Sequence, residues 1–140
     1  MAVLGGVAFV LHYLWENAHI ELYTAYDGIS GPMPIVLYAT LGDVAYTLFA
    51  YALFALYKRD AQWVSRVRMR DCAYLALLGF SIAVFVEWKA MFLERWAYTP
   101  DMPLVFGLGL SPILQMTILL PLSVILSSYL LVALSRMHRA

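Results

Sequence analysis

The sequence contains little charge. Asp, Glu, Lys and Arg make up 13% of its 140 residues, the formal net charge is zero, and no Lys or Arg occurs before Lys58. Soluble domains have about a quarter charged residues, so the composition excludes an ordinary soluble domain. Zero net charge gives no support for a nucleic-acid partner. Without a basic N-terminal segment or a small-residue cleavage site, the first apolar run is not expected to be a cleavable signal peptide.

Cysteine is nearly absent as well. Cys72 is the one cysteine in the sequence, which excludes a disulfide within the chain. A free cysteine usually behaves as a small buried apolar residue, and this is the role expected for Cys72.

Apolar residues, by contrast, account for 64% of the chain. A helix needs about 20 mostly apolar residues to cross the hydrocarbon core of a bilayer. Four such stretches occur, at residues 2–24, 34–57, 73–96 and 112–134. We therefore predict an all-α, integral membrane four-helix bundle that forms one domain over residues 1–140, in the cytoplasmic membrane of a bacterium or archaeon.

Basic residues gather in two places that orient this bundle. They are Lys58, Arg59, Arg66, Arg68 and Arg70 between the second and third spans, and Arg136 and Arg139 near the C-terminus. Because Lys and Arg are retained in cytoplasmic loops, both termini are predicted to be cytoplasmic. The outward link 98–112 is apolar and rich in proline and glycine, which predicts either a cap over the outer end of the bundle or an interfacial loop.

The first predicted span contains a polar stripe. His12, Glu16, His19 and Tyr23 are separated by four, three and four residues. This spacing places side chains on one face of a helix. Charged groups in mid-membrane are costly unless they face the interior of a bundle, so the stripe is expected to face the other helices.

Three further spans contribute polar residues at a similar depth. With a rise of about 1.5 Å per residue, Glu16, Asp43 and Glu87 each lie about 12 to 13 Å from the outer end of their spans. Gln115 lies slightly nearer the outer surface. Lys89, two residues after Glu87, is expected to point to the opposite side and outward. The sequence therefore predicts a polar pocket shared by the helices, with aromatic and hydroxyl groups nearby from Trp15, Tyr38, Tyr46, Thr47 and Trp88.

Such a pocket suits acid–base chemistry on a hydrophobic lipid or isoprenoid, without a cofactor. Apolar surroundings favour the neutral form of a carboxyl group, which can then donate a proton. Glu16 is predicted to be the acid and Asp43 or Glu87 the base, with His12 and His19 adjusting them. Aromatic faces stabilise a carbocation intermediate. The predicted substrate-binding residues are Trp15, Tyr23, Tyr46, Trp88 and Gln115.

A metal site is the first alternative. Glu16 and His19 form a Glu-x-x-His pair, the pairing used in di-iron helical bundles. Asp43 and Glu87 would complete a set of nitrogen and oxygen ligands for one Fe, Zn or Mn ion. The sequence has no second Glu-x-x-His pair, so only a mononuclear site is predicted.

Proton-coupled transport is the second alternative. Glu16 in the first span resembles the glutamate of the small multidrug resistance transporters, which binds drug and proton in a dimer. This chain departs from that family because it is longer, has acids in the second and third spans, and has an apolar outer link.

Two short motifs resemble enzyme families. "LHYLWE" is similar to the intramembrane His-x-x-x-Glu of sterol-isomerase and EXPERA-type proteins. "LWENAH" and "LGDVAYTLF" resemble the Trp-Glu and downstream Asp of fungal membrane terpene cyclases, which like the small heterodimeric lycopene cyclases protonate an isoprenoid within a helical bundle. The resemblance implies an isomerase or cyclase whose partners are membrane lipids and a hydrophobic small molecule, with a homodimer or a partner subunit as a way to complete the site.

Overall fold

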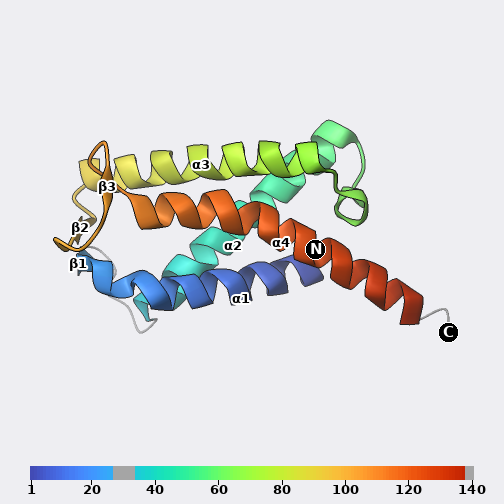
Figure 1. Cartoon of the computed structure of the whole chain (residues 1–140), viewed down its shortest axis with the longest axis horizontal. Helices are drawn as coiled ribbons and strands as arrows, with labels where there is room; N and C mark the ends of the chain where they lie inside the picture. Colours follow the sequence, from blue (N-terminus) through green and yellow to red (C-terminus); the bar gives the residue numbers. More distant parts are fainter. Residues whose placement is uncertain (27–33, 138–140) are drawn as a thin grey trace.

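The computed structural model describes residues 1–26 and 34–137 as four long helices with short strands gathered at one end (Figure 1). The helices are α1 (Ala2–His19), α2 (Ile35–Lys58), α3 (Met69–Phe92) and α4 (Leu110–Met137). The strands are β1 (Tyr23–Tyr26), β2 (Trp96–Tyr98), β3 (Leu104–Val105) and β4 (Leu108–Gly109), and the short 3₁₀ helices are η1 (Ile20–Leu22) and η2 (Trp63–Arg66). Within the described residues three helices, α2, α3 and α4, are long and apolar enough to cross a membrane, as expected for an integral membrane protein. The sequence predicts four spans, but α1 is not among these three.

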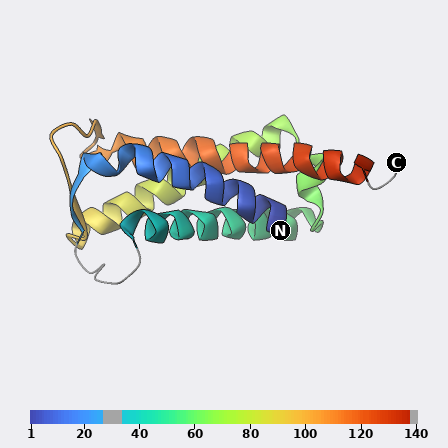
Figure 2. The ribbon, with the colours of Figure 1, turned by 90° about the horizontal axis from the view of Figure 1, so that it is seen from below.

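The helices pack around α4. It lies between α3 and α1, while α2 crosses the bundle and also packs on α1 (Figures 1 and 2). Gly79 allows α3 to pack tightly on α4, because a Cβ at this position would lie 2.3 Å from the carbonyl oxygen of Met116. Buried residues such as Leu75, Leu120 and Val124 fill the core beside this contact.

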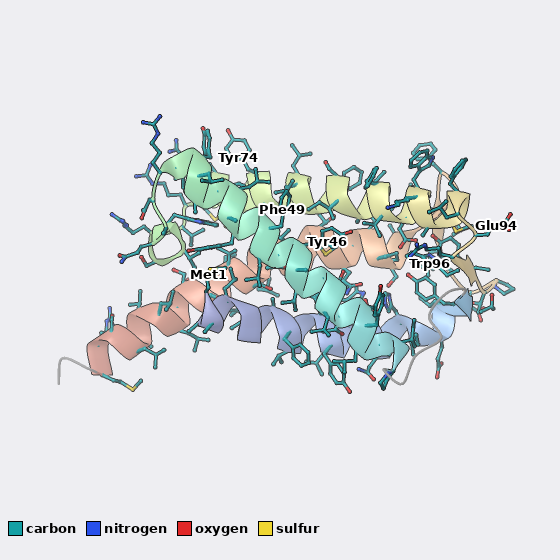
Figure 3. All side chains as sticks on the ribbon, turned by 180° about the vertical axis from the view of Figure 1, so that it is seen from behind. Met1, Tyr46, Phe49, Tyr74, Glu94 and Trp96 are labelled. Atoms are coloured by element: carbon teal, nitrogen blue, oxygen red, sulfur yellow. The ribbon has the colours of Figure 1, made fainter. Side chains whose placement is uncertain are left out.

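The outward faces of the helices are apolar. Phe49 on α2 and Tyr74 on α3 have 55% and 58% of their surface exposed, and both project from the bundle (Figure 3). In a soluble protein so many exposed aromatic and aliphatic side chains would promote association, whereas acyl chains cover such a surface in a bilayer. The exposed faces therefore agree with the membrane location.

Two of the helices end earlier than the sequence predicts. Residues 2–24 and 73–96 were expected to be helical, but α1 ends at His19 and α3 at Phe92. Glu94 adopts a left-handed conformation with φ of 52°, and the amide of Arg95 donates to the carbonyl of Ala90 at 2.9 Å. These features terminate α3 in the manner of a Schellman motif and turn the chain back toward the bundle.

Short strands replace the ends of these two predicted spans. β1 pairs antiparallel with β2, with Tyr23 opposite Tyr98. β3 and β4 form a second hairpin, whose two loop residues, Phe106 and Gly107, both have positive φ. Such turns match the twist of paired strands. The outward link is thus a structured cap at the end of the bundle where α3 ends and α4 begins.

At the opposite end of the bundle, the chain between α2 and α3 packs against α2 and α4. Trp63 in η2 is buried, and its Nε1–H donates to the carbonyl of Tyr51 at 3.2 Å. Lys58 Nζ lies 2.6 Å from Oδ2 of the buried Asp71. Arg139, one of the basic residues that orient the predicted topology, lies outside the described residues.

Candidate functional site

Gln115 of α4 connects carboxylates from two other helices. Its amide nitrogen lies 2.8 Å from Glu16 Oε1 of α1 and 2.7 Å from Asp43 Oδ2 of α2. Gln115 is buried, and a primary amide has two hydrogens, one for each carboxylate. The structure therefore brings together Glu16, Asp43 and Gln115 at one level, as the depth of each residue along its span predicts.

His12 lies behind this cluster, deep in the bundle. Its side chain is fully buried, with Nδ1 3.4 Å from Asp43 Oδ2 and Nε2 3.5 Å from Thr47 Oγ1. Nδ1 is also 3.2 Å from the amide nitrogen of Gln115, but the shorter contacts to Glu16 and Asp43 use both amide hydrogens. Asp43 is thus the acid that His12 positions.

His19 lies beside the other oxygen of Glu16. His19 Nε2 lies 3.2 Å from Glu16 Oε2, one helical turn away on α1. The other ring nitrogen, Nδ1, is 2.8 Å from the hydroxyl of Ser111, which also accepts from Trp15 Nε1–H at 3.3 Å. Glu16 therefore has a neutral amide on one oxygen and an imidazole on the other.

Glu87 forms a second group with the outer cap. Its carboxylate accepts hydrogen bonds from the hydroxyl of Tyr98 and, at 3.4 Å, from Trp96 Nε1–H. The amide of Gly109 donates to the same tyrosine oxygen at 3.1 Å. Burial and the neighbouring Glu87 carboxylate raise the pKa of Tyr98, so its hydroxyl remains a proton donor at neutral pH.

The sequence did not predict Tyr98 or Trp96 as site residues. Both lie on β2, in a segment whose pairing partner β1 is far away in the sequence. One signal was available: an aromatic pair with N–H and O–H groups, two residues apart, follows the third span. Residues two apart on a strand point to the same face, which allows both side chains to reach Glu87.

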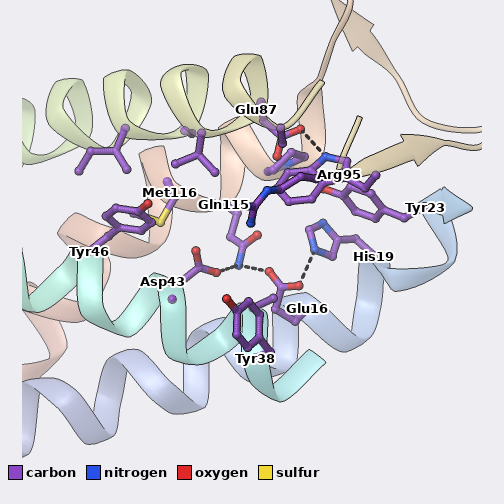
Figure 4. A pocket seen from close by; sticks show the side chains of 18 of the residues that line it. Glu16, His19, Tyr23, Tyr38, Asp43, Tyr46, Glu87, Arg95, Gln115 and Met116 are labelled. Carbon is purple, nitrogen blue, oxygen red and sulfur yellow. Dashed lines mark hydrogen bonds and ion pairs between the residues drawn. The ribbon is translucent and has the colours of Figure 1, made fainter. Parts of the chain in front are cut away.

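A cavity of about 640 Å³ opens beside these residues (Figure 4). Its size lies within the range of about 300 to 1,000 Å³ that is usual for small-molecule sites. Its polar lining includes Glu16, His19, Asp43, Glu87 and Gln115. Much of its apolar lining comes from α2 and α3, namely Ile35, Tyr38, Leu41, Tyr46, Ile82, Phe85 and Val86.

The other predicted substrate-binding residues lie at different distances from this cavity. Tyr23 and Tyr46 line it, although Tyr23 belongs to β1 and not to the first helix. Trp15 does not line the cavity but contacts Ser111 next to it. Trp88 is 55% exposed on the outward face of α3, where it stacks on Phe92, so it lies away from the cavity.

Lys89 and Arg95 also line the cavity. Lys89 is exposed, as expected for an outward-pointing lysine, but the sequence placed it on the side of α3 opposite Glu87. Lys89 lies within the last turn of α3, and a lysine side chain is long enough to bend past the end of the helix toward the cavity. Figure 4 shows Arg95 on the same side of the cavity as Glu87 and Tyr23.

The predicted metal-ligand set does not fit one ion. In residues 1–26 and 34–137, no group of three or more His, Cys, Asp or Glu side chains is arranged to hold a metal. Between Glu16 and Asp43 lies the amide nitrogen of Gln115, whose hydrogens face both carboxylates. A hydrogen-bond donor thus takes the place that a cation between these acids would need.

Comparison with protein-family models, with curated proteins and with solved structures finds no match to this chain.

Proposed function

We propose that this protein is an intramembrane acid–base enzyme, an isomerase or cyclase, acting on a hydrophobic lipid or isoprenoid. The observation that supports it is the convergence of Glu16, Asp43 and Glu87 on one cavity whose lining is otherwise mostly apolar. The apolar lining accommodates a hydrocarbon chain. The acids and histidine supply groups that donate and accept protons.

Glu16 is the proposed general acid. In its neutral form it would protonate a carbon–carbon double bond and give a carbocation. Asp43 or Glu87, as a carboxylate, would then take a proton from a neighbouring carbon, and the electrons of that carbon–hydrogen bond would form the new double bond. The product is an isomer of the substrate, or a ring where the cation is first attacked by a second double bond.

Aromatic rings would stabilise the cation between these two proton transfers. Tyr23, Tyr46 and Trp96 line the cavity. An aromatic face attracts a cation with about 0.5 to 2 kcal/mol, more when water is excluded. Trp96 takes the role that the sequence assigned to Trp88.

The proposed topology has four spans with both termini in the cytoplasm. α1 has 18 residues and a length of about 27 Å, close to the thickness of the hydrocarbon core. Its polar residues His12, Glu16 and His19 are buried, whereas Val10 and Leu14 are more than half exposed, as on a helix that faces lipid. The basic residues between α2 and α3 support a cytoplasmic position for that end.

Untargeted mass spectrometry of membrane lipids tests the function. Cells producing the wild type are compared with cells producing Glu16→Gln, and with Glu21→Gln as the control, since Glu21 is exposed in η1. We expect a lipid whose retention time changes in cells with the wild type and Glu21→Gln but not with Glu16→Gln.

Equal membrane levels and circular dichroism spectra establish that all three proteins are folded. Identical lipid profiles from cells with the folded wild type and the folded Glu16→Gln variant would contradict the proposal that this protein is an enzyme. If Glu16→Gln instead abolished proton-driven uptake of a hydrophobic cation into vesicles, the transport alternative would replace the proposal.

A further inference from the structure

Two basic side chains line the cavity without a direct acidic partner among the described residues. Lys89 and Arg95 both line it, and in the part of the chain that the structure describes neither forms an ion pair or a side-chain hydrogen bond. The left-handed turn at Glu94 places Arg95 here, because the chain reverses direction at the end of α3. Both cations thus lie at the outer end of α3, near its last turn.

The three acids of the cavity, in contrast, already have donors. Glu16 and Asp43 accept from the amide of Gln115, and Glu87 accepts from Tyr98. These donors stabilise the acids and hold them in place. The N–H groups of Lys89 and Arg95, in contrast, are left for a ligand, and such groups bind an anion.

The cavity also opens sideways from the bundle. Leu41 on α2 and Phe85 on α3 line it, yet 44% and 58% of their surface is exposed. Both lie about 10 Å from the outer ends of their helices, at a depth where the surroundings are hydrocarbon. The opening between α2 and α3 thus faces acyl chains, and a hydrophobic ligand reaches the cavity from the bilayer.

We propose that the ligand of this cavity is an amphiphile with a phosphate or diphosphate head group. Lys89 and Arg95 bind the head group near the outer surface, and the apolar chain extends between α2 and α3 toward Glu16 and Asp43. Arg pairs with phosphate through two parallel hydrogen bonds and Lys acts as a point charge, so the pair suits this anion. The proposal rests on the proposed function, for which it specifies the class of substrate.

Binding to the purified protein in neutral detergent tests this assignment. The probes are geranylgeranyl diphosphate, the uncharged geranylgeraniol and inorganic diphosphate, each titrated by calorimetry. The variants are Lys89→Gln, Arg95→Gln and the double variant, with Lys89→Arg to restore the charge. Arg136→Gln is the matched control, since Arg136 is exposed in the last turn of α4.

We expect the wild type to bind geranylgeranyl diphosphate more tightly than geranylgeraniol. The double variant should lose about tenfold or more of its affinity for the diphosphate, the loss expected for charge-assisted hydrogen bonds, with affinity for the alcohol unchanged. Lys89→Arg and Arg136→Gln should retain diphosphate binding. Inorganic diphosphate should bind weakly because it lacks the chain. A further titration with phosphatidic acid shows whether the phosphate-bearing ligand is an isoprenoid or a phospholipid.

Equal affinity of the wild type for the diphosphate and the alcohol would overturn the inference. So would a double variant that binds both as the wild type does. Selective diphosphate binding without any lipid converted in cells would leave this inference standing and contradict the enzymatic proposal. If the double variant converted a neutral lipid at the same rate as the wild type, the enzymatic proposal would stand and this inference would be overturned.

Discussion

The side-chain amide of Gln115 donates a 2.8 Å hydrogen bond to the carboxylate of Glu16, 99 positions earlier in the chain. The second amide hydrogen reaches Asp43 at 2.7 Å. A single uncharged side chain thus connects α4 to α1 and α2 at the level of the cavity. Stability and site geometry both depend on this residue.

Substitution of Gln115 tests that dependence. Gln115→Leu leaves the buried Glu16 and the partly buried Asp43 without their shared donor, so we expect the free energy of unfolding to fall by about 1 to 3 kcal/mol. Gln62→Leu makes the same chemical change at an exposed position and should have little effect. Thermal unfolding in detergent, followed by circular dichroism, measures both. Equal stability of Gln115→Leu and the wild type would show that the amide contacts are incidental.

Tyr98→Phe separates Glu87 from the outer cap. The change removes the hydroxyl that donates to Glu87 and accepts from the amide of Gly109, and keeps the ring. We expect a loss of about 1 to 2 kcal/mol of stability and a lower rate of any lipid conversion. Tyr57→Phe is the control, because Tyr57 is 82% exposed and outside the cavity. A fully active, fully stable Tyr98→Phe protein would exclude a role for this hydroxyl.

The contact of α3 with α4 is tested by Gly79→Ala. The added Cβ would lie 2.3 Å from the carbonyl oxygen of Met116, so the helices must separate. Overpacking of this kind costs about 1 to 3 kcal/mol. Gly6→Ala on α1 meets no atom within 4 Å and should be neutral or stabilising by up to about 1 kcal/mol, because alanine favours a helix. Unfolding by increasing fractions of sodium dodecyl sulfate measures both; similar midpoints for the two variants would show that the packing is loose.

The end of the bundle where α2 leads into α3 offers a matched comparison of ion pairs. Lys58→Met leaves the buried Asp71 without its cation at 2.6 Å, which should cost roughly 3 kcal/mol. Arg66→Met breaks an exposed pair with Asp60, where about 0 to 1 kcal/mol is expected. Chemical unfolding of both variants gives the difference. An equal effect of the two substitutions would mean that burial of Asp71 adds nothing to the pair.

The helical part of the site could be predicted from spacing and depth. His12, Glu16 and His19 repeat at helical intervals, and all three are buried as a stripe facing the bundle must be. Depth along the spans placed Glu16, Asp43 and Glu87 at the same level, with Gln115 slightly nearer the outer surface, and all four line one cavity. Trp88 was predicted to bind the substrate, but it does not line the cavity. Successive residues of a helix are rotated by about 100°, so Trp88, which directly follows Glu87, points in a different direction.

The outer cap could not be predicted in the same way. Tyr98 and Trp96 reach Glu87 because β2 pairs with β1, and that pairing joins segments separated by about half of the chain. Strands of two to four residues have too few positions for an alternating pattern. Register between such strands is determined by the helices that bring their ends together, which is a tertiary effect.

Gln115 has one further consequence for the chemistry of the site. An amide nitrogen that donates to two carboxylates has no lone pair with which to accept a proton, so it cannot relay one from Glu16 to Asp43. The amide therefore holds the two acids together without passing a proton between them. Glu16 and Asp43 also lie within hydrogen-bond reach of each other, so a proton exchanged by this pair would move directly from one carboxyl oxygen to the other.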